Sequence, residues 1–144
     1  MEGACHAQSV REVMTSDPKT VDAGASVAEA ARIMADADVG AVVVVDGGQV
    51  AGIVTDRDVT VRAVAKGRDP ASTPVREVCS AELTTLNPQD TVDDAVRLMR
   101  EKAVRRLPVM EGGRPVGIVS LGDLAVEREP QSALGDISAA PPNP

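Results

Sequence analysis

The stretch Gly-Ile-Val-Thr-Asp-Arg-Asp at residues 52–58 returns as Gly-Ile-Val-Ser-Leu-Gly-Asp at residues 117–123. The same offset of 65 residues carries Val-Arg-Glu-Val at residues 10–13 onto an identical stretch at residues 75–78, with no gap between. Self-similarity at a fixed period indicates one supersecondary unit used twice. Two half-modules related by a pseudo-two-fold axis are expected to enclose a cleft, and we expect the functional site there.

The composition narrows the class of function. The chain has 144 residues, a net charge of -7 and no Phe, Tyr or Trp. This length supports one compact domain or two small interlocked ones, with an aliphatic core. A nucleic-acid partner is disfavoured, because no aromatic ring can stack on a base and the basic residues are scattered. No apolar run approaches the roughly 20 residues of a membrane span, so we expect a cytoplasmic protein with no membrane partner.

Residue spacing predicts the same elements in both repeats. Residues 20–21 form a short extended piece, and apolar residues at i, i+3, i+4 and i+7 from Val27 and from Val92 predict helices with one buried stripe. Both helices begin at capping-box patterns, in which each partner satisfies the backbone amide of the other. Hairpins closed by Gly-Gly follow, and their strands are predicted at residues 41–45 and 50–54, and at 106–110 and 115–119.

A second helix is predicted from Thr55 to about Lys66, after which Gly and Pro mark the join between the copies. The fold class is therefore α+β, with two tandem β-α-β-β-α repeats at residues 10–66 and 75–127 packed with pseudo-two-fold symmetry. Proline-rich residues 128–144 carry no periodicity, which predicts a disordered tail.

Thr55 with Asp58, and Ser120 with Asp123, are the first candidates for ligand contact. Each pair follows directly on a buried strand, so we expect the hydroxyl and the first free amides of the next helix to favour a phosphate. A carboxylate with free lone pairs suits the two vicinal hydroxyls of a ribose. The same pattern is also a capping box, as are Ser26-x-x-Glu29 and Thr91-x-x-Asp94, so some of the four segments are helix starts only.

Arg105 and Arg106 are the next candidates, because a planar guanidinium is the preferred partner of a phosphate. They stand beside the second hairpin where the first repeat has Gly40 and Ala41, so two binding sites should not be equivalent. The alternative for either arginine is a solvated charge at the edge of the sheet.

These residues together resemble a known family. Two copies of a unit ending in Gly-hydrophobic-hydrophobic-Thr/Ser-x-x-Asp, with Val-Arg-Arg-Leu-Pro-Val at residues 104–109, are similar to a tandem pair of cystathionine-β-synthase (CBS) domains, or Bateman module, of the stand-alone bacterial type. The resemblance covers about residues 10–127. It implies a sensor that binds AMP, ADP, ATP or S-adenosylmethionine in the cleft between the repeats and associates into disk-like dimers, head to head or head to tail.

The resemblance also implies roles for particular residues. The backbone near Thr20 and Val21, and near Thr85 and Leu86, would frame the adenine, and the two arginines would reach the phosphate of a nucleotide whose ribose lies on Asp58. Where the family often has a proline in the first hairpin strand, as at Pro108 in the second repeat, the first repeat has Val43.

The sequence thus predicts a non-catalytic regulatory module that binds an adenosyl ligand, forms a homodimer and acts on an effector protein whose identity it does not reveal. The alternative is a scaffold or dimerisation module whose clefts are empty or degenerate. A metal or redox sensor built on Cys5, His6 and Cys79 ranks third, since a structural zinc site needs four ligands in local pairs. No Ser/His/Asp set supports catalysis.

Overall fold

The computed structural model describes residues 8–80 and 84–128. Contacts divide these residues into two compact units. The first unit consists of residues 17–80 and 112–115, and the second unit of residues 8–16, 84–111 and 116–128. The tail predicted from residue 128 lies, from residue 129 onward, outside the described residues, as do Cys5 and His6.

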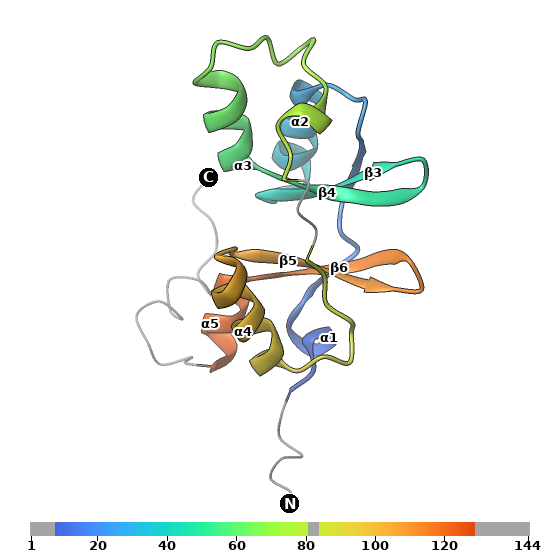
Figure 1. Ribbon diagram of the computed structural model, residues 1–144, viewed down its shortest axis with the longest axis vertical. Coiled ribbons are helices and arrows are strands. Elements are labelled where there is room, and N and C mark those ends of the chain that lie inside the picture. The colour runs from blue at the N-terminus through green and yellow to red at the C-terminus, as the bar shows by residue number, and fades with distance from the viewer. Residues whose placement is uncertain (1–7, 81–83, 129–144) are drawn as a thin grey trace, which may run out of the picture. The chain divides into compact units, whose positions relative to one another are not determined.

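The first unit is a three-stranded sheet with helices on one face (Figure 1). Strand β2 (Thr20–Asp22) runs parallel to β3 (Ala41–Asp46), which forms an antiparallel hairpin with β4 (Gln49–Thr55). Helix α2 (Val27–Ala37) precedes the hairpin, and α3 (Asp56–Asp58) follows it and continues as a π-helical segment, η2 (Val59–Val64). The hairpin turn at Gly47 and Gly48 has positive φ at both glycines, as the predicted Gly-Gly turn requires.

The second unit repeats this architecture. Strands β5 (Arg106–Glu111) and β6 (Arg114–Ser120) form its hairpin, α4 (Val92–Lys102) precedes the hairpin and α5 (Leu121–Arg128) follows it. Figure 1 shows α4 and α5 on one face of the hairpin, like α2 and α3 in the first unit. The predicted α+β class is confirmed, as are both hairpins and the helices predicted to start at Val27 and Val92, which are α2 and α4. The strands of the hairpins lie within one or two residues of their predicted bounds.

The leading segment of each repeat packs in the unit of the other repeat. Helix α1 (Val10–Val13) and strand β1 (Thr15–Ser16) belong to the second unit, where β1 pairs with β6. In return, the 3-10 turn η3 (Val75–Glu77) and Ser80 belong to the first unit, where Ser80 bridges Ile53 of β4. The two compact units therefore differ from the two sequence repeats by a reciprocal exchange of these segments.

Each unit has its own aliphatic core, to which the exchanged segment contributes. The first core comprises Val21, Ala23, Val27, Ala30, Met34, Val42, Val44, Val54, Ala63, Val75 and Val78. The second comprises Val10, Leu86, Val92, Ala95, Met99, Leu107, Val109, Val119 and Leu124. The predicted helical stripe is confirmed, except that Ala31 and Val96 are only partly buried at its margin.

Two prolines explain why the first unit has a strand β2 and the second does not. In the first unit the Val43 amide donates to the Lys19 carbonyl at 2.9 Å, and the Ala23 amide donates to the Val45 carbonyl at 2.8 Å, which extends the pairing of β2 at both ends. Pro108 and Pro88 occupy the equivalent positions and have no N–H, so only an isolated bridge joins Leu86 to Val109.

The glycines that open the repeated motif are required by the exchange. A Cβ on Gly52 would overlap the carbonyl of Ser80, and a Cβ on Gly117 would overlap the side chain of Met14. Neither glycine has a positive φ, so the requirement is one of space rather than of backbone conformation. The two obstacles differ, because the Ser80 carbonyl is backbone held by its bridge to Ile53, whereas a methionine side chain can move.

Replacing these glycines tests that difference. We expect Gly52→Ala to lower the free energy of unfolding by about 1–3 kcal/mol, the usual cost of overpacking, and Gly117→Ala to cost less. Urea unfolding of both variants beside the unchanged chain measures this. If Gly117→Ala lowered the free energy of unfolding as much as Gly52→Ala or more, the contact with the Ser80 carbonyl would not be the reason for a glycine at residue 52.

Three of the four capping-box patterns form reciprocal caps. At α4 the Thr91 amide donates to Asp94 Oδ2 at 3.1 Å and the Asp94 amide donates to Thr91 Oγ1 at 3.0 Å. At α2 only half of the predicted cap forms, because Ser26 accepts from the Glu29 amide while the Glu29 carboxylate pairs with Arg32.

A helical segment follows Thr55 and ends at Val64, within two residues of the predicted end near Lys66, but most of it is not a regular α-helix. Only Asp56–Asp58 is α-helical; the following segment is π-helical and ends at Val64. The Thr60 hydroxyl donates to the Asp56 carbonyl at 3.0 Å and so competes for an acceptor of the regular helix. Bonds between residues five apart then close the segment, as from the Ala65 amide to the Thr60 carbonyl at 2.8 Å.

The α4 cap makes stability depend on pH. The hydrogen bonds from Thr91, its backbone amide first, hold the pKa of Asp94 below its ordinary value. A depressed folded-state pKa means that the stabilisation is present above the unfolded-state pKa and is lost as pH falls through the folded-state pKa. We therefore expect Asp94→Asn to lower the melting temperature at pH 7, and this deficit to shrink as pH falls below about 4.

Melting curves between pH 7 and pH 3 measure the effect. Asp36→Asn, which removes an exposed carboxylate outside any cap, is the control for charge alone. A deficit for Asp94→Asn that stays constant or grows in acid would contradict the cap as its cause.

Candidate functional site

The two strand–helix junctions are built alike. At the first junction the Thr55 amide donates to Asp58 Oδ2 at 3.0 Å, and the Asp58 amide donates to Thr55 Oγ1 at 3.1 Å. At the second junction the Ser120 amide donates to Asp123 Oδ2 at 2.9 Å, and the Asp123 amide donates to Ser120 Oγ at 3.1 Å. All four predicted residues therefore form capping boxes, and each carboxylate uses one oxygen for its cap.

The second carboxylate oxygen distinguishes the junctions. Asp58 is buried, with 8% of its surface exposed, and its Oδ1 lies 3.7 Å from Arg62 Nε. Asp123 is half-buried, and its Oδ1 has no partner among the described residues. At α4, whose cap has the same geometry, Arg97 contacts Asp94 Oδ1 at 3.2 Å. Of these three capping aspartates, Asp123 alone has an oxygen that the described residues leave unpaired.

The prediction of free amides at the start of α3 is wrong. The amide of Asp56 donates to the Gly40 carbonyl, and the amide of Arg57 donates to Asp56 Oδ1 at 2.8 Å. Since the Asp58 amide is used by Thr55, no amide of this short helix is left for a phosphate. At the second junction Leu121 replaces Asp56 and has no carboxylate, so the Gly122 amide lacks that partner.

Arg105 is exposed and lies beside the second junction. Its carbonyl accepts from the Leu121 amide at 2.8 Å, which ties the start of β5 to the start of α5. Arg106, the first residue of β5, is half-buried. Neither guanidinium has an ion-pair partner among residues 8–80 and 84–128. The corresponding residues of the first unit, Gly40 and Ala41, carry no charge, so the predicted asymmetry is present.

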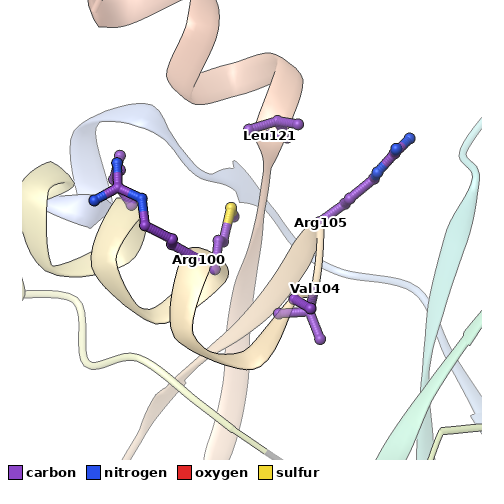
Figure 2. Close-up of a pocket in the computed structure, with 7 residues that line it drawn as sticks. Arg100, Val104, Arg105 and Leu121 are labelled. Atoms are coloured by element: carbon purple, nitrogen blue, oxygen red, sulfur yellow. The ribbon is translucent and has the colours of Figure 1, made fainter.

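Arg105 lines a pocket of about 380 Å³ in the second unit (Figure 2). Figure 2 shows Arg105 and Arg100 pointing in different directions, with Val104 and Leu121 between them. Val96, Met99 and Ala103 complete an apolar lining. The two arginines are the charged groups of this pocket, and its position beside Ser120 was not indicated by the sequence.

The four residues predicted near the adenine divide into two kinds. Val21 and Leu86 are buried in the two cores, so their side chains are committed to packing. Thr20 and Thr85 are exposed, and β2 is an edge strand of its sheet, which presents a row of backbone donors and acceptors on its outer side.

Arg62, which the sequence did not single out, and Thr84, which lies in the stretch expected to frame the adenine, affect these sites. Arg62 contacts Asp58 and also reaches the carbonyls of Val78 and Cys79, each at 3.5 Å. Thr84 is equivalent to Lys19, whose carbonyl accepts from the Val43 amide. Because Pro108 stands in the place of Val43 and has no N–H, the Thr84 carbonyl lacks this partner. Pro108 is the signal in the sequence for this unpaired carbonyl, because a proline donates no backbone hydrogen bond.

The third hypothesis, a metal or redox sensor, finds no support in the described residues. They contain no group of three or more His, Cys, Asp or Glu side chains placed to hold a metal. Burial raises the pKa of the Cys79 thiol, and the Asp58 carboxylate raises it further, which keeps the sulfur protonated and unreactive. None of the described helices is long and apolar enough to cross a membrane.

Comparison with known proteins gives the family. The family model of the CBS domain matches residues 10–64 and 75–128. The CBS domain-containing protein YhcV of Bacillus subtilis is 43% identical over 127 residues, which are 88% of this chain and 90% of that protein. A putative signal-transduction protein with CBS domains from Burkholderia ambifaria superimposes with a TM-score of 0.77 at 33% identity, covering 87% of this chain and 96% of that one.

Two further structures differ from each other in what they contain. Hypoxic Response Protein I, with two coordinated zinc ions, has a TM-score of 0.73 at 28% identity over 82% of this chain and 97% of its own. A hexameric CBS-CP12 protein from bloom-forming cyanobacteria has a TM-score of 0.78 at 27% identity over 89% of this chain and 74% of its own. The family match, the repeated architecture and the relative that covers nearly the whole chain agree, and this chain belongs to the CBS-domain family, with two CBS domains in tandem.

Proposed function

We propose that this CBS pair is a non-catalytic sensor that binds an adenine nucleotide or S-adenosylmethionine and regulates a partner protein. CBS domains are regulatory modules, and the proposal names the class of ligand and the residues that hold it. The observation that carries it is the carboxylate oxygen of Asp123 that its capping box with Ser120 leaves unpaired among the described residues.

The ribose is assigned to the aspartates. A carboxylate accepts from both hydroxyls of a ribose, and Asp123 can do so with Oδ1 while Oδ2 keeps its cap. Asp58 can do so only by sharing Oδ1 with Arg62. The ribose contact is therefore stronger at Asp123, and the Asp58 site is the weaker of the two.

The adenine is assigned to backbone groups and aliphatic walls, since the chain has no aromatic residue to stack on it. In the second unit the Thr84 carbonyl, without a donor from Pro108, can accept from the exocyclic amine of adenine, and Thr85 is exposed beside it. In the first unit the Lys19 carbonyl is already paired with Val43, which leaves the outer edge of β2 at Thr20.

The phosphates are assigned to arginines. The helix amides of the first junction are occupied, so that junction offers no free N–H group to a phosphate. Arg105 and Arg106 are the candidates because neither has an ion-pair partner in the described part of the chain, and a guanidinium binds phosphate through two parallel hydrogen bonds. The second repeat has these arginines and the first repeat does not. We therefore expect one site to distinguish ligands by their number of phosphates.

The output of the sensor is proposed to pass through self-association. The CBS-CP12 protein of similar fold is hexameric, and oligomers of soluble proteins are most often closed dimers. We therefore propose a homodimer whose contacts respond to the occupancy of the ligand sites and which acts on an effector protein.

The competing function is a scaffold with degenerate sites. It is favoured by the caps of Thr55 and Asp58, which satisfy their donors without any ligand.

Substitution of the capping aspartates separates binding from capping. We expect Asp123→Ala to weaken the affinity for AMP by about 1.5–3 kcal/mol, the scale of a hydrogen bond to a charged group, and Asp58→Ala to weaken it less. Asp94→Ala is the matched control, since it destroys a cap of the same geometry at α4 and should lower the melting temperature without changing affinity.

Isothermal titration with AMP, ADP, ATP and S-adenosylmethionine measures these affinities, after a thermal-shift screen selects the ligands that bind. No shift with any of the four, or unchanged affinity in Asp123→Ala and Asp58→Ala together, would leave the junctions as caps only. The scaffold function would then replace the sensor.

The arginines are tested by phosphate number and salt. Arg105→Ala should weaken ATP binding more than AMP binding, and the difference should fade as salt rises from 0.05 to about 0.5 M, because the screening length shortens. The loss in Asp123→Ala should hardly depend on salt, since ribose hydroxyls are neutral. An Arg105→Ala effect that is equal for AMP and ATP would remove this residue from the phosphate site.

A further inference from the structure

Arg62 joins the first junction to the exchanged segment of the first unit, residues 75–80. Its Nε lies 3.7 Å from Asp58 Oδ1, and its Nη1 lies 3.5 Å from the carbonyl oxygens of Val78 and of Cys79. All three distances are at or beyond the outer limit of a hydrogen bond, so two sets of acceptors share the guanidinium. A shift toward either set strengthens one contact and weakens the other.

The two carbonyls lie directly before the point where the segment joins the sheet. The Ser80 amide donates to the Ile53 carbonyl at 3.0 Å, and the Ile53 amide donates to the Ser80 carbonyl at 3.2 Å. Within residues 8–80 and 84–128, Arg62 is the donor that reaches the two carbonyls. Because β4 continues into α3, the contacts form a ring that runs from β4 through the capping aspartate and Arg62 to the segment, and back to β4.

This link belongs to the first repeat. Arg62 lies in η2, and π-helical segments are rare in proteins and often occur at functional sites. In the second repeat the α-helix α5 takes the place of η2, and Glu127 stands at the position equivalent to Arg62. An ionised carboxylate has no hydrogen to donate to a carbonyl, so the second repeat cannot make the same link.

We propose that Arg62 carries the occupancy of Asp58 to the exchanged segment. A ribose hydroxyl that donates to Oδ1 weakens the attraction of this oxygen for Arg62, and the guanidinium then moves to the Val78 and Cys79 carbonyls. Binding at the first junction thus holds the segment more firmly against β4. The inference rests on the proposed function, which assigns a ribose to Asp58, and it makes Arg62 a positioning residue that acts through Asp58.

The position of the segment in the chain gives this link a regulatory use. Residues 84–111, which follow the segment closely, belong to the second unit. Occupancy of the first junction therefore changes how firmly the chain is held where it leaves the first unit. Because coupling between two sites is reciprocal, a firmly held segment in turn raises the affinity of the first junction for its ligand.

A variant without ligand tests the link first. Amide hydrogen exchange at residues 78–80 measures how firmly the segment is held. Asp58→Asn removes the charge that attracts Arg62 and keeps an oxygen for the Thr55 amide, so it mimics occupancy. We expect these amides to exchange roughly three- to tenfold more slowly in Asp58→Asn, which corresponds to about one net hydrogen bond. If Asp58 only supported the fold, they would exchange faster.

Two further variants control this result. Arg62→Met keeps an aliphatic side chain and removes the donors, so residues 78–80 should exchange faster, and adding Asp58→Asn should not slow them. Asp94→Asn is the matched control, because it neutralises a capping aspartate whose second oxygen contacts Arg97, and it should leave residues 78–80 unchanged. Melting curves verify that each variant is folded.

AMP supplies a second readout in an Asp123→Ala chain, in which the second junction has lost its carboxylate. Calorimetric titration gives the AMP concentration that saturates the remaining site. Saturating AMP should slow the exchange of residues 78–80 by a factor similar to that of Asp58→Asn. The same concentration should have no such effect once Arg62→Met is added, because the link to the segment is then absent.

The outcomes separate this inference from the proposed function. Slower exchange with AMP in the chain that carries Arg62→Met would mean that the ligand itself holds the segment, and would overturn the role of Arg62. Unchanged or faster exchange in ligand-free Asp58→Asn would also overturn it and leave the binding of AMP standing. An Asp123→Ala chain that does not bind AMP would overturn the coupling, since the first junction would not be a ligand site. The sensor function itself is judged by titration of the unchanged chain.

Discussion

The structure depends on the close approach of an exchanged segment to the glycine that opens each repeated motif. The Ser80 carbonyl lies over Gly52, and Met14 lies over Gly117, where any side chain would overlap them. This contact adds the exchanged segment to the hairpin of the other repeat and places Val75 and Val10 in cores that neither repeat would complete alone. The core of each unit therefore contains a valine from the leading segment of the other repeat, so neither repeat completes its core from its own residues.

The same architecture serves two unequal junctions. In the first unit every polar group at the junction is satisfied internally: Asp58 by Thr55 and Arg62, the helix amides by Gly40, Asp56 and Thr55. In the second unit Leu121 replaces the carboxylate and Pro108 removes a backbone donor, so groups that are paired in the first unit lack these partners. Both junctions nevertheless keep the same capping box, so the difference in pairing does not change the start of the helix.

The asymmetry extends to the outer helices. Asp38 against Ala103 and Asp56 against Leu121 each change the charge between the repeats, at positions where the backbone is alike.

The sequence by itself determined the repeat, the α+β class, the hairpins and the capping residues, because these follow from spacing and local hydrogen bonding. Thr91 and Asp94 form the predicted cap, and the Gly-Gly turns have the predicted conformation. Only the tertiary structure decided which segment completes which core, because Val10 and Val75 are identical in local sequence and fit either repeat. It also decided that Arg62 reaches the carbonyls of Val78 and Cys79 in the exchanged segment, since these contacts join residues that are 16 and 17 positions apart in the sequence.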